Sequence, residues 1–165
     1  MTSQNFYFKR LFNNKMEENK DILLSTEEKL KNIQDKWVNI VSDLNEKMKD
    51  LPGIDSLLNT IYSKRQDLCD YLYSILNILG KLTRQYKTKY AERYNYYKLG
   101  KNGLRYNNES AIATQIEADL ENEKTNIMLV SNNVDFCKET LKTIDNMIYG
   151  VNQKIKIYEL INGIK

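Results

Sequence analysis

The stretch Ile127–Tyr158, IMLVSNNVDFCKETLKTIDNMIYGVNQKIKIY, decides the fold because its apolar side chains recur at alternating intervals of three and four residues. Four heptads of this strict period predict a long helix with a left-handed coiled-coil seam. The seam positions are Ile127, Val130, Val134, Cys137, Leu141, Ile144, Ile148, Val151, Ile155 and Tyr158. Further apolar residues outside the seam indicate more than one neighbour, so we expect this helix to drive homo-oligomerisation. The expected interface residues are Val134, Leu141, Ile144, Ile148, Val151 and Ile155.

Two more helices are predicted before this one. Ser25 as N-cap, with Glu28 closing a capping box, predicts a helix that ends at Pro52–Gly53. Helical spacing of apolar residues then predicts a second helix up to about Leu99, and a third helix is expected to begin near Ser110. With one proline and little strand-type alternation, the sequence predicts an all-α fold of long helices in a hairpin or bundle.

Composition argues against most enzyme classes and against a metal site. The chain has no histidine, and its two cysteines, Cys69 and Cys137, stand far apart with no CxxC pair. Carboxylates are spread over helix surfaces, and Gly100 and Gly103 are too sparse for a phosphate-binding loop. We therefore expect no catalytic residues, no metal and no cofactor.

Hydropathy gives no sign of a membrane protein. No run of about 18 apolar residues exists, and the N-terminus lacks the apolar core and cleavage site of a signal peptide. Two unpaired cysteines at apolar helical positions favour buried thiols in a reducing compartment. We therefore expect a cytoplasmic protein that does not insert into a membrane.

Charge is concentrated in one window, residues 86–106, YKTKYAERYNYYKLGKNGLRY. It holds six tyrosines and six Lys or Arg residues against one acid, Glu92, whereas the whole chain carries a net charge of only +3. At about 100° per residue, Tyr86, Tyr90, Arg93 and Tyr97 fall within about 60° of one another on a helix. Rings then line the middle of one face, and cations border it on both sides.

This pattern is typical of single-stranded nucleic-acid binding. Rings stack on exposed bases at about 1–3 kcal/mol each, cations neutralise phosphates, and duplex DNA offers no free ring faces. The expected binding residues are Lys89, Arg93, Tyr96, Tyr97, Lys98, Lys101 and Arg105.

A purely structural role is the alternative for several of these residues. Tyr86, Tyr90 and Tyr97 also continue the apolar stripe that runs from Leu68 to Leu82. Basic residues at a helix C-terminus, moreover, suit the helix dipole, which would explain the lysine at position 98 without any ligand. Both interpretations stay open at the level of the sequence.

The stretch ERYNYYKLGKN, residues 92–102, resembles the signature of the UvsY-type recombination mediators of tailed phages. That family carries Arg-x-[Asp/Asn]-Tyr-Tyr followed by Gly and a basic residue; the matching positions here are Arg93, Asn95, Tyr96, Tyr97, Gly100 and Lys101. Leu99 is an extra residue before the glycine. Ala91 stands where some members have lysine, so Lys89 is expected to substitute.

Two helical stretches extend the resemblance. KLKNIQDKWVN, residues 29–39, and the segment 134–165 are similar to the N-terminal start and the C-terminal helix of the family. The resemblance thus implies one helical mediator domain over residues 29–165, with residues 1–28 as an extension. It places DNA binding at about residues 84–106 and oligomerisation at about residues 127–162.

The resemblance also implies partners and a role. Members are non-enzymatic, bind single-stranded DNA, form rings through the C-terminal helix, and load a RecA-like recombinase onto strands coated by single-strand-binding protein. It therefore implies a hexamer or heptamer in which Arg93 contacts DNA. Two alternatives remain: a coiled-coil assembly protein whose Tyr/Lys stretch is an interface, and a peripheral protein that binds anionic lipid through lysines and the aromatic N-terminus.

Overall fold

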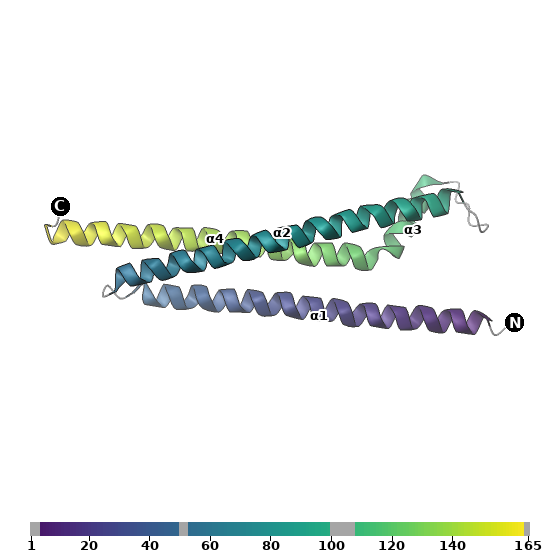
Figure 1. Ribbon diagram of the computed structural model, residues 1–165, viewed down its shortest axis with the longest axis horizontal. Helices are drawn as coiled ribbons and strands as arrows, with labels where there is room; N and C mark the ends of the chain where they lie inside the picture. Colours follow the sequence, from purple (N-terminus) through teal and green to yellow (C-terminus); the bar gives the residue numbers. More distant parts are fainter. Residues whose placement is uncertain (1–3, 50–52, 100–107, 164–165) are drawn as a thin grey trace. The chain divides into compact units, whose positions relative to one another are not determined.

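The structure, a computed structural model, describes the backbone of residues 4–49, 53–99 and 108–163, and the side chains within these ranges from residue 26 onward except Asp55. The residues described form helices and turns without any strand, which confirms the predicted all-α class. The helices are α1 (Gln4–Lys47), α2 (Ile54–Leu99), α3 (Glu109–Asp119) and α4 (Glu121–Ile161) (Figure 1).

Two compact units divide the chain. The first, here called the motif unit, comprises Met1–Lys31 and Leu79–Val130 and contains the motif that resembles a mediator signature. The second, here called the bundle unit, comprises Asn32–Ile78 and Ser131–Lys165. The helices α1, α2 and α4 therefore each contribute residues to both units.

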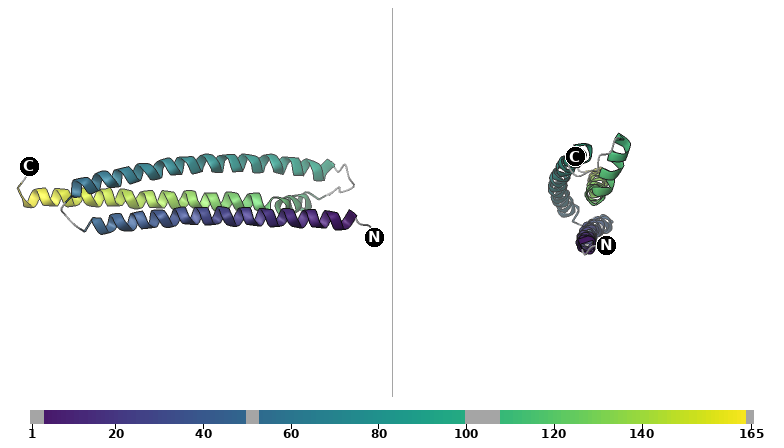
Figure 2. Two further views of the ribbon diagram at one scale, coloured as in Figure 1. Left: turned by 60° about the horizontal axis from the view of Figure 1, so that its bottom comes forward. Right: turned by 90° about the vertical axis from the view of Figure 1, so that its right-hand side faces the viewer.

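The bundle unit consists of three helical segments that lie side by side (Figures 1 and 2). Along α1 and α4 the contacts advance together, from Gln34 with Asn133 to Met48 with Lys154, so these two helices run parallel. Along α2 the direction reverses, because Arg65 pairs with Asp145 whereas Tyr71, further along α2, bonds back to Asn133. Apolar stripes on all three segments thus face a shared interior.

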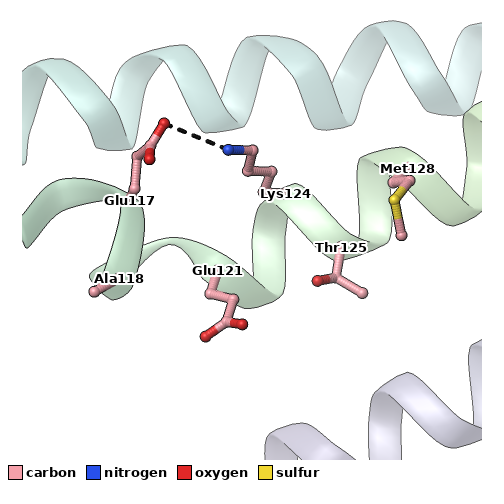
Figure 3. Close-up of a pocket in the computed structure, with 6 residues that line it drawn as sticks. All are labelled: Glu117, Ala118, Glu121, Lys124, Thr125 and Met128. Carbon is pink, nitrogen blue, oxygen red and sulfur yellow. Dashed lines mark hydrogen bonds and ion pairs between the residues drawn. The ribbon is translucent and has the colours of Figure 1, made fainter. Parts of the chain in front are cut away.

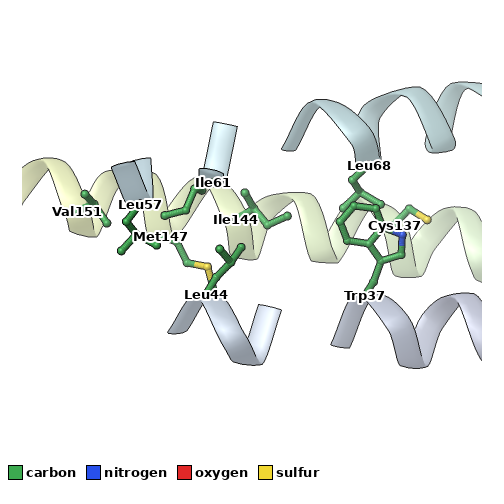
Figure 4. Packing of buried hydrophobic residues seen from close by; sticks show 9 residues of the cluster. All are labelled: Trp37, Leu44, Leu57, Ile61, Leu68, Cys137, Ile144, Met147 and Val151. Atoms are coloured by element: carbon green, nitrogen blue, oxygen red, sulfur yellow. The ribbon is translucent and has the colours of Figure 1, made fainter. Parts of the chain in front are cut away.

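The core of the bundle unit is continuous from Trp37 to Val151 (Figure 4). Leu44 from α1, Ile61 and Leu68 from α2, and Ile144 from α4 are all at most 1% exposed. The buried residues of this cluster, among the described side chains, are Trp37, Leu44, Leu57, Ile61, Leu68, Cys137, Ile144, Met147 and Val151. Burial also raises the pKa of the Cys137 thiol to about 11, so this thiol stays protonated and behaves as a small apolar side chain.

The periodic seam of α4 is therefore a core element of the chain itself. Val134, Ile144 and Val151 are at most 2% exposed within one chain, so they cannot also face a second subunit while the bundle is closed. Leu141, Ile148 and Ile155 are partly buried against the same core. α1 and α2 thus provide neighbours for the seam within one chain, and the role of these residues in contacts between copies stays a prediction.

Helix boundaries differ from the sequence expectation in two places. α1 begins at Gln4 rather than near Ser25, because residues 4–24 contain neither glycine nor proline to stop a helix. The third predicted helix begins within one residue of Ser110 but is interrupted at Leu120, where the backbone leaves helical geometry at φ −110°, ψ 19°. Leu120 is buried at this break, at 3% exposed. Neither glycine nor proline lies nearby in the sequence, so the break could not be predicted from a helix-breaking residue.

The glycines at positions 80 and 53 provide a matched test of this backbone. A Cβ at Gly80, inside α2, would meet no atom within 4 Å, so no close contact among the described residues requires a glycine there. Gly80→Ala is expected to raise the free energy of unfolding by about 0.8 kcal/mol, since alanine fixes less backbone entropy in a helix. Gly53, which has φ +88° before α2, should respond oppositely, with Gly53→Ala costing about 1 kcal/mol. Urea denaturation of both variants measures these effects, and a destabilised Gly80→Ala protein would contradict the open helix surface.

Candidate nucleic-acid interface

The candidate interface is built on the last turns of α2, against which α3 and the start of α4 pack within the motif unit. α3 begins where the Asn108 side chain accepts a hydrogen bond of 2.9 Å from the backbone N–H of Ser110, an N-cap. α3 then runs back along α2, because Lys98 pairs with its first residue, Glu109, and Arg93, five residues earlier on α2, pairs with its last, Asp119.

A small apolar core fills the space between α2 and α3. It comprises Tyr97 from α2 together with Ile112, Ile116 and Leu120, all at most 7% exposed. Tyr86, Tyr90 and Tyr94 are partly buried against it. All three tyrosines, Tyr86, Tyr90 and Tyr97, thus continue the packing face of α2, as the alternative of a purely structural role expected.

Tyr97, which was expected to stack on a base, is buried in the small core between α2 and α3. Its ring is 7% exposed, so no base can stack on it in this arrangement, and its role as a stacking residue is corrected. Its hydroxyl donates to Oδ2 of Asp119 at 2.6 Å. Burial, followed by this hydrogen bond, raises the pKa of the Tyr97 phenol to about 12. Tyr97 therefore anchors the end of α3 to α2.

Arg93 lies beside the same carboxylate. Its Nε is 3.6 Å from Oδ2 of Asp119, and its side chain is 50% exposed. Gln115 donates a further hydrogen bond of 3.3 Å to Oδ1 of Asp119. At 3.6 Å, the contact with Asp119 is an ion pair rather than a close hydrogen bond. Since half of the Arg93 side chain remains open, the guanidinium still presents donors to solvent.

Lys98 is held in a compact polar cluster at the end of α2. Its Nζ is 2.8 Å from Oε1 of Glu109 and donates at 2.8 Å to the hydroxyl of Tyr94. The Tyr94 hydroxyl in turn donates to Glu109 at 2.9 Å. The hydrogen bond from Lys98, followed by that from Tyr94, lowers the pKa of the Glu109 carboxyl, and the hydrogen bond to Glu109 raises the pKa of Lys98. Both side chains are more than half exposed, so solvent screens this pair.

Lys89, one turn before Arg93 on α2, also forms an ion pair. Its Nζ is 2.6 Å from Oε1 of Glu123 in the first turn of α4. Each of the predicted cations Lys89, Arg93 and Lys98 therefore faces a carboxylate of the same unit. The other two predicted cations, Lys101 and Arg105, lie outside the described residues.

Tyr96 differs from the buried ring beside it. It is 42% exposed, and it touches Tyr97 edge-on with ring centroids 5.3 Å apart. Because of this exposure, part of the Tyr96 side chain stays accessible to a base, unlike that of Tyr97.

A second set of cations lies on the other side of α2, and sequence reasoning did not select it. Lys81, Arg84 and Lys87 are exposed, and among the described side chains no carboxylate lies within ion-pair distance of them. The Arg84 guanidinium donates to the carbonyl of Gly80 at 3.3 Å, within its own helix. At about 100° per residue, these three residues lie about 120–180° around the helix from Arg93. Their spacing of three residues, which places one cation on each of three successive turns, is the sequence signal that could have identified them.

A hollow lies on the surface of α3 and the start of α4. This hollow of about 410 Å³ is lined by Glu117, Ala118, Glu121, Lys124, Thr125 and Met128 (Figure 3). Glu117 and Lys124 pair there at 3.4 Å, and the side chains of Glu121 and Thr125 point away from this pair. Within residues 26–49, 53–99 and 108–163, moreover, no three Cys, Asp or Glu side chains gather as metal ligands would.

Comparison with known proteins adds no family. No protein-family model, no curated protein and no solved structure matches the chain. No helix in the described part of the chain combines the length and the apolar character needed to cross a membrane.

Proposed function

We propose that this protein is a recombination mediator that binds single-stranded DNA through the motif unit. The observation that carries the proposal is the open row of cations on α2, Lys81, Arg84 and Lys87, which extends the positive charge of the motif onto a face without described carboxylate partners. Charge that is not neutralised internally is what a phosphate backbone recognises. The resemblance of residues 92–102 to mediator signatures supports the same proposal.

In this proposal the open cations make the first contact with the strand. Lys81, Arg84 and Lys87 span about 9 Å along the helix, within reach of consecutive phosphates. The exposed ring of Tyr96 then supplies a stacking surface, which favours unpaired over paired bases. The partners proposed from the resemblance are a RecA-like recombinase and a single-strand-binding protein.

Assembly is the second part of the proposal. Although the seam of α4 is buried in the chain's own core, the last turns of α4 leave Ile157, Tyr158, Leu160 and Ile161 between 53% and 80% exposed. Clustered apolar residues at the end of a helix favour contact with another copy of the chain. A ring of six or seven copies would present several weak DNA sites at once and would raise the avidity for one strand.

A salt-varied oligonucleotide titration tests the DNA-binding proposal. Replacing Lys81 and Lys87 by glutamine is expected to weaken binding of a labelled single strand about tenfold at low salt. The slope of log K against log salt should become shallower by up to about 1.4, because two phosphate contacts are lost. Duplex DNA of the same length should bind more weakly than the single strand.

The matched control replaces Lys138 and Lys142, two exposed lysines of the bundle unit, by glutamine. This double variant has the same change of net charge, so its affinity should stay within about twofold of the wild type if binding is local to α2. An equal loss in both double variants would show that only total charge matters. Absence of any salt-dependent binding by the wild type would overturn the proposal.

A coiled-coil assembly protein without nucleic-acid binding is the second candidate. The pairing of Lys89, Arg93 and Lys98 with internal carboxylates favours it, because these contacts give the cations a structural role. Both candidates expect self-association, so the titration with single-stranded DNA is what separates them.

A further inference from the structure

We propose that the carboxylates of Glu109, Asp119 and Glu123 act as an internal competitor of DNA, so that α3 and the start of α4 restrain the motif until a strand displaces these contacts. This inference rests on the proposed function and concerns the regulation of that same site. The three carboxylates are called the acidic latch below.

Each carboxylate of the latch faces one of the three predicted cations that the structure describes. Glu123 is 2.6 Å from Lys89, Asp119 is 3.6 Å from Arg93, and Glu109 is 2.8 Å from Lys98. All three carboxylates come from outside α2, between 11 and 34 residues further along the chain. A helix packed along α2 thereby places anionic oxygens against the cations expected to contact phosphate.

The strength of these contacts suits a reversible restraint. The three cationic side chains are between 50% and 52% exposed, so each ion pair is open to solvent and to a competing anion. Exposed pairs contribute little to stability and weaken with salt. A polyanion that offers several phosphates at once can therefore replace several such pairs in a single binding event.

The apolar contacts of α3 keep the helix in place when DNA replaces the ion pairs. Ile112, Ile116 and Leu120 are buried against Tyr97, so α3 stays docked through its apolar side when the ion pairs open. The expected exchange is local: lysine and arginine side chains turn from carboxylate to phosphate. The motif unit can then bind DNA without unfolding.

Charge-neutral substitutions test the latch directly. The double variant Glu109→Gln with Glu123→Gln keeps the side-chain shapes but removes the charges that face Lys98 and Lys89. It is expected to bind single-stranded DNA about tenfold more tightly than the wild type, since two ion pairs no longer compete. The salt dependence of binding should also become steeper, because no carboxylate takes up a counterion when the lysines are released.

The chain offers a matched control on the same two helices. Glu117→Gln with Glu121→Gln changes the same residue types and the same net charge, but neither glutamate faces a motif cation: Glu117 pairs with Lys124, and both glutamates line the hollow of Figure 3. This control is expected to gain no more than about twofold. In a Lys89→Gln background, moreover, the gain from Glu123→Gln should disappear, because no cation is left to release.

The outcomes separate the latch from the function beneath it. Equal gains in both double variants, or a loss of affinity in the Glu109/Glu123 variant alone, would overturn the latch while DNA binding stands. If neither the wild type nor any variant binds, the proposed function fails. Circular dichroism of each variant checks that α3 remains folded.

Discussion

Replacing Ile144 by alanine is expected to lower the free energy of unfolding by about 3 kcal/mol. Ile144 is completely buried, between residues of α1 and α2 in the bundle unit (Figure 4). Removing its outer carbons forfeits their transfer free energy and leaves a cavity that close-packed neighbours fill only in part. Urea denaturation, followed by circular dichroism or by the fluorescence of Trp37, measures the change.

The matched control is Ile78→Ala, which makes the same substitution at a residue of α2 that is 48% exposed. Its effect should stay within about 0.5 kcal/mol. The loss at Ile144 should also be independent of protein concentration, because the cavity forms inside one chain. A loss that shrinks as the protein is concentrated would place Ile144 at a subunit interface and contradict its burial in the chain's own core.

The sequence predicted the helical class and the seam of α4 but not the identity of the neighbour. Strict heptad spacing determines which face of a helix is apolar, whether the facing helix belongs to the same chain or to another. Here Ile144 and Val151 pack in one cluster with residues of α1 and α2. Neighbours within the chain thus account for the spacing of these residues, and an interface between copies at these positions stays a prediction.

The candidate site was predictable to a similar extent. Residue angles correctly placed Tyr86, Tyr90 and Tyr97 on one face of α2, and the apolar stripe before them correctly offered a packing role. The carboxylates that meet Lys89, Arg93 and Lys98 could not be foreseen, because they lie on α3 and the start of α4, which meet α2 only in the folded chain. A single sequence carries no local signal for such a long-range pairing.

Asn133→Asp is the substitution with the second large expected effect, about 3 kcal/mol of destabilisation at neutral pH. Asn133 on α4 is completely buried in the bundle unit, where its amide contacts side chains of both α1 and α2. It donates to the Tyr71 hydroxyl at 2.9 Å and accepts from Gln34 at 3.4 Å. Burial raises the pKa of the Tyr71 phenol, which marks the site as poorly solvated. A carboxylate placed there would lose its hydration without gaining a cation.

The destabilisation by Asn133→Asp should vanish at low pH, because protonation removes the buried negative charge. Burial raises the folded-state pKa of the new aspartate above its unfolded value of about 3.9, so the folded protein binds the proton more tightly. Relative to wild type at the same pH, the destabilisation is therefore complete above the folded pKa and fades as pH falls toward 3.9. The protonated acid also reproduces the asparagine, since its hydroxyl can donate to Tyr71 while its carbonyl accepts from Gln34.

Asn132→Asp is the control, because it makes the same change at the adjacent, exposed position. It should alter stability by no more than about 0.5 kcal/mol, with little dependence on pH. Thermal unfolding of the wild type and both variants between pH 4 and pH 8 provides the comparison, within the range in which the expected pKa shift acts. If Asn133→Asp unfolded like Asn132→Asp at every pH, position 133 would be hydrated, and the polar contact that joins α1, α2 and α4 could not be a buried one.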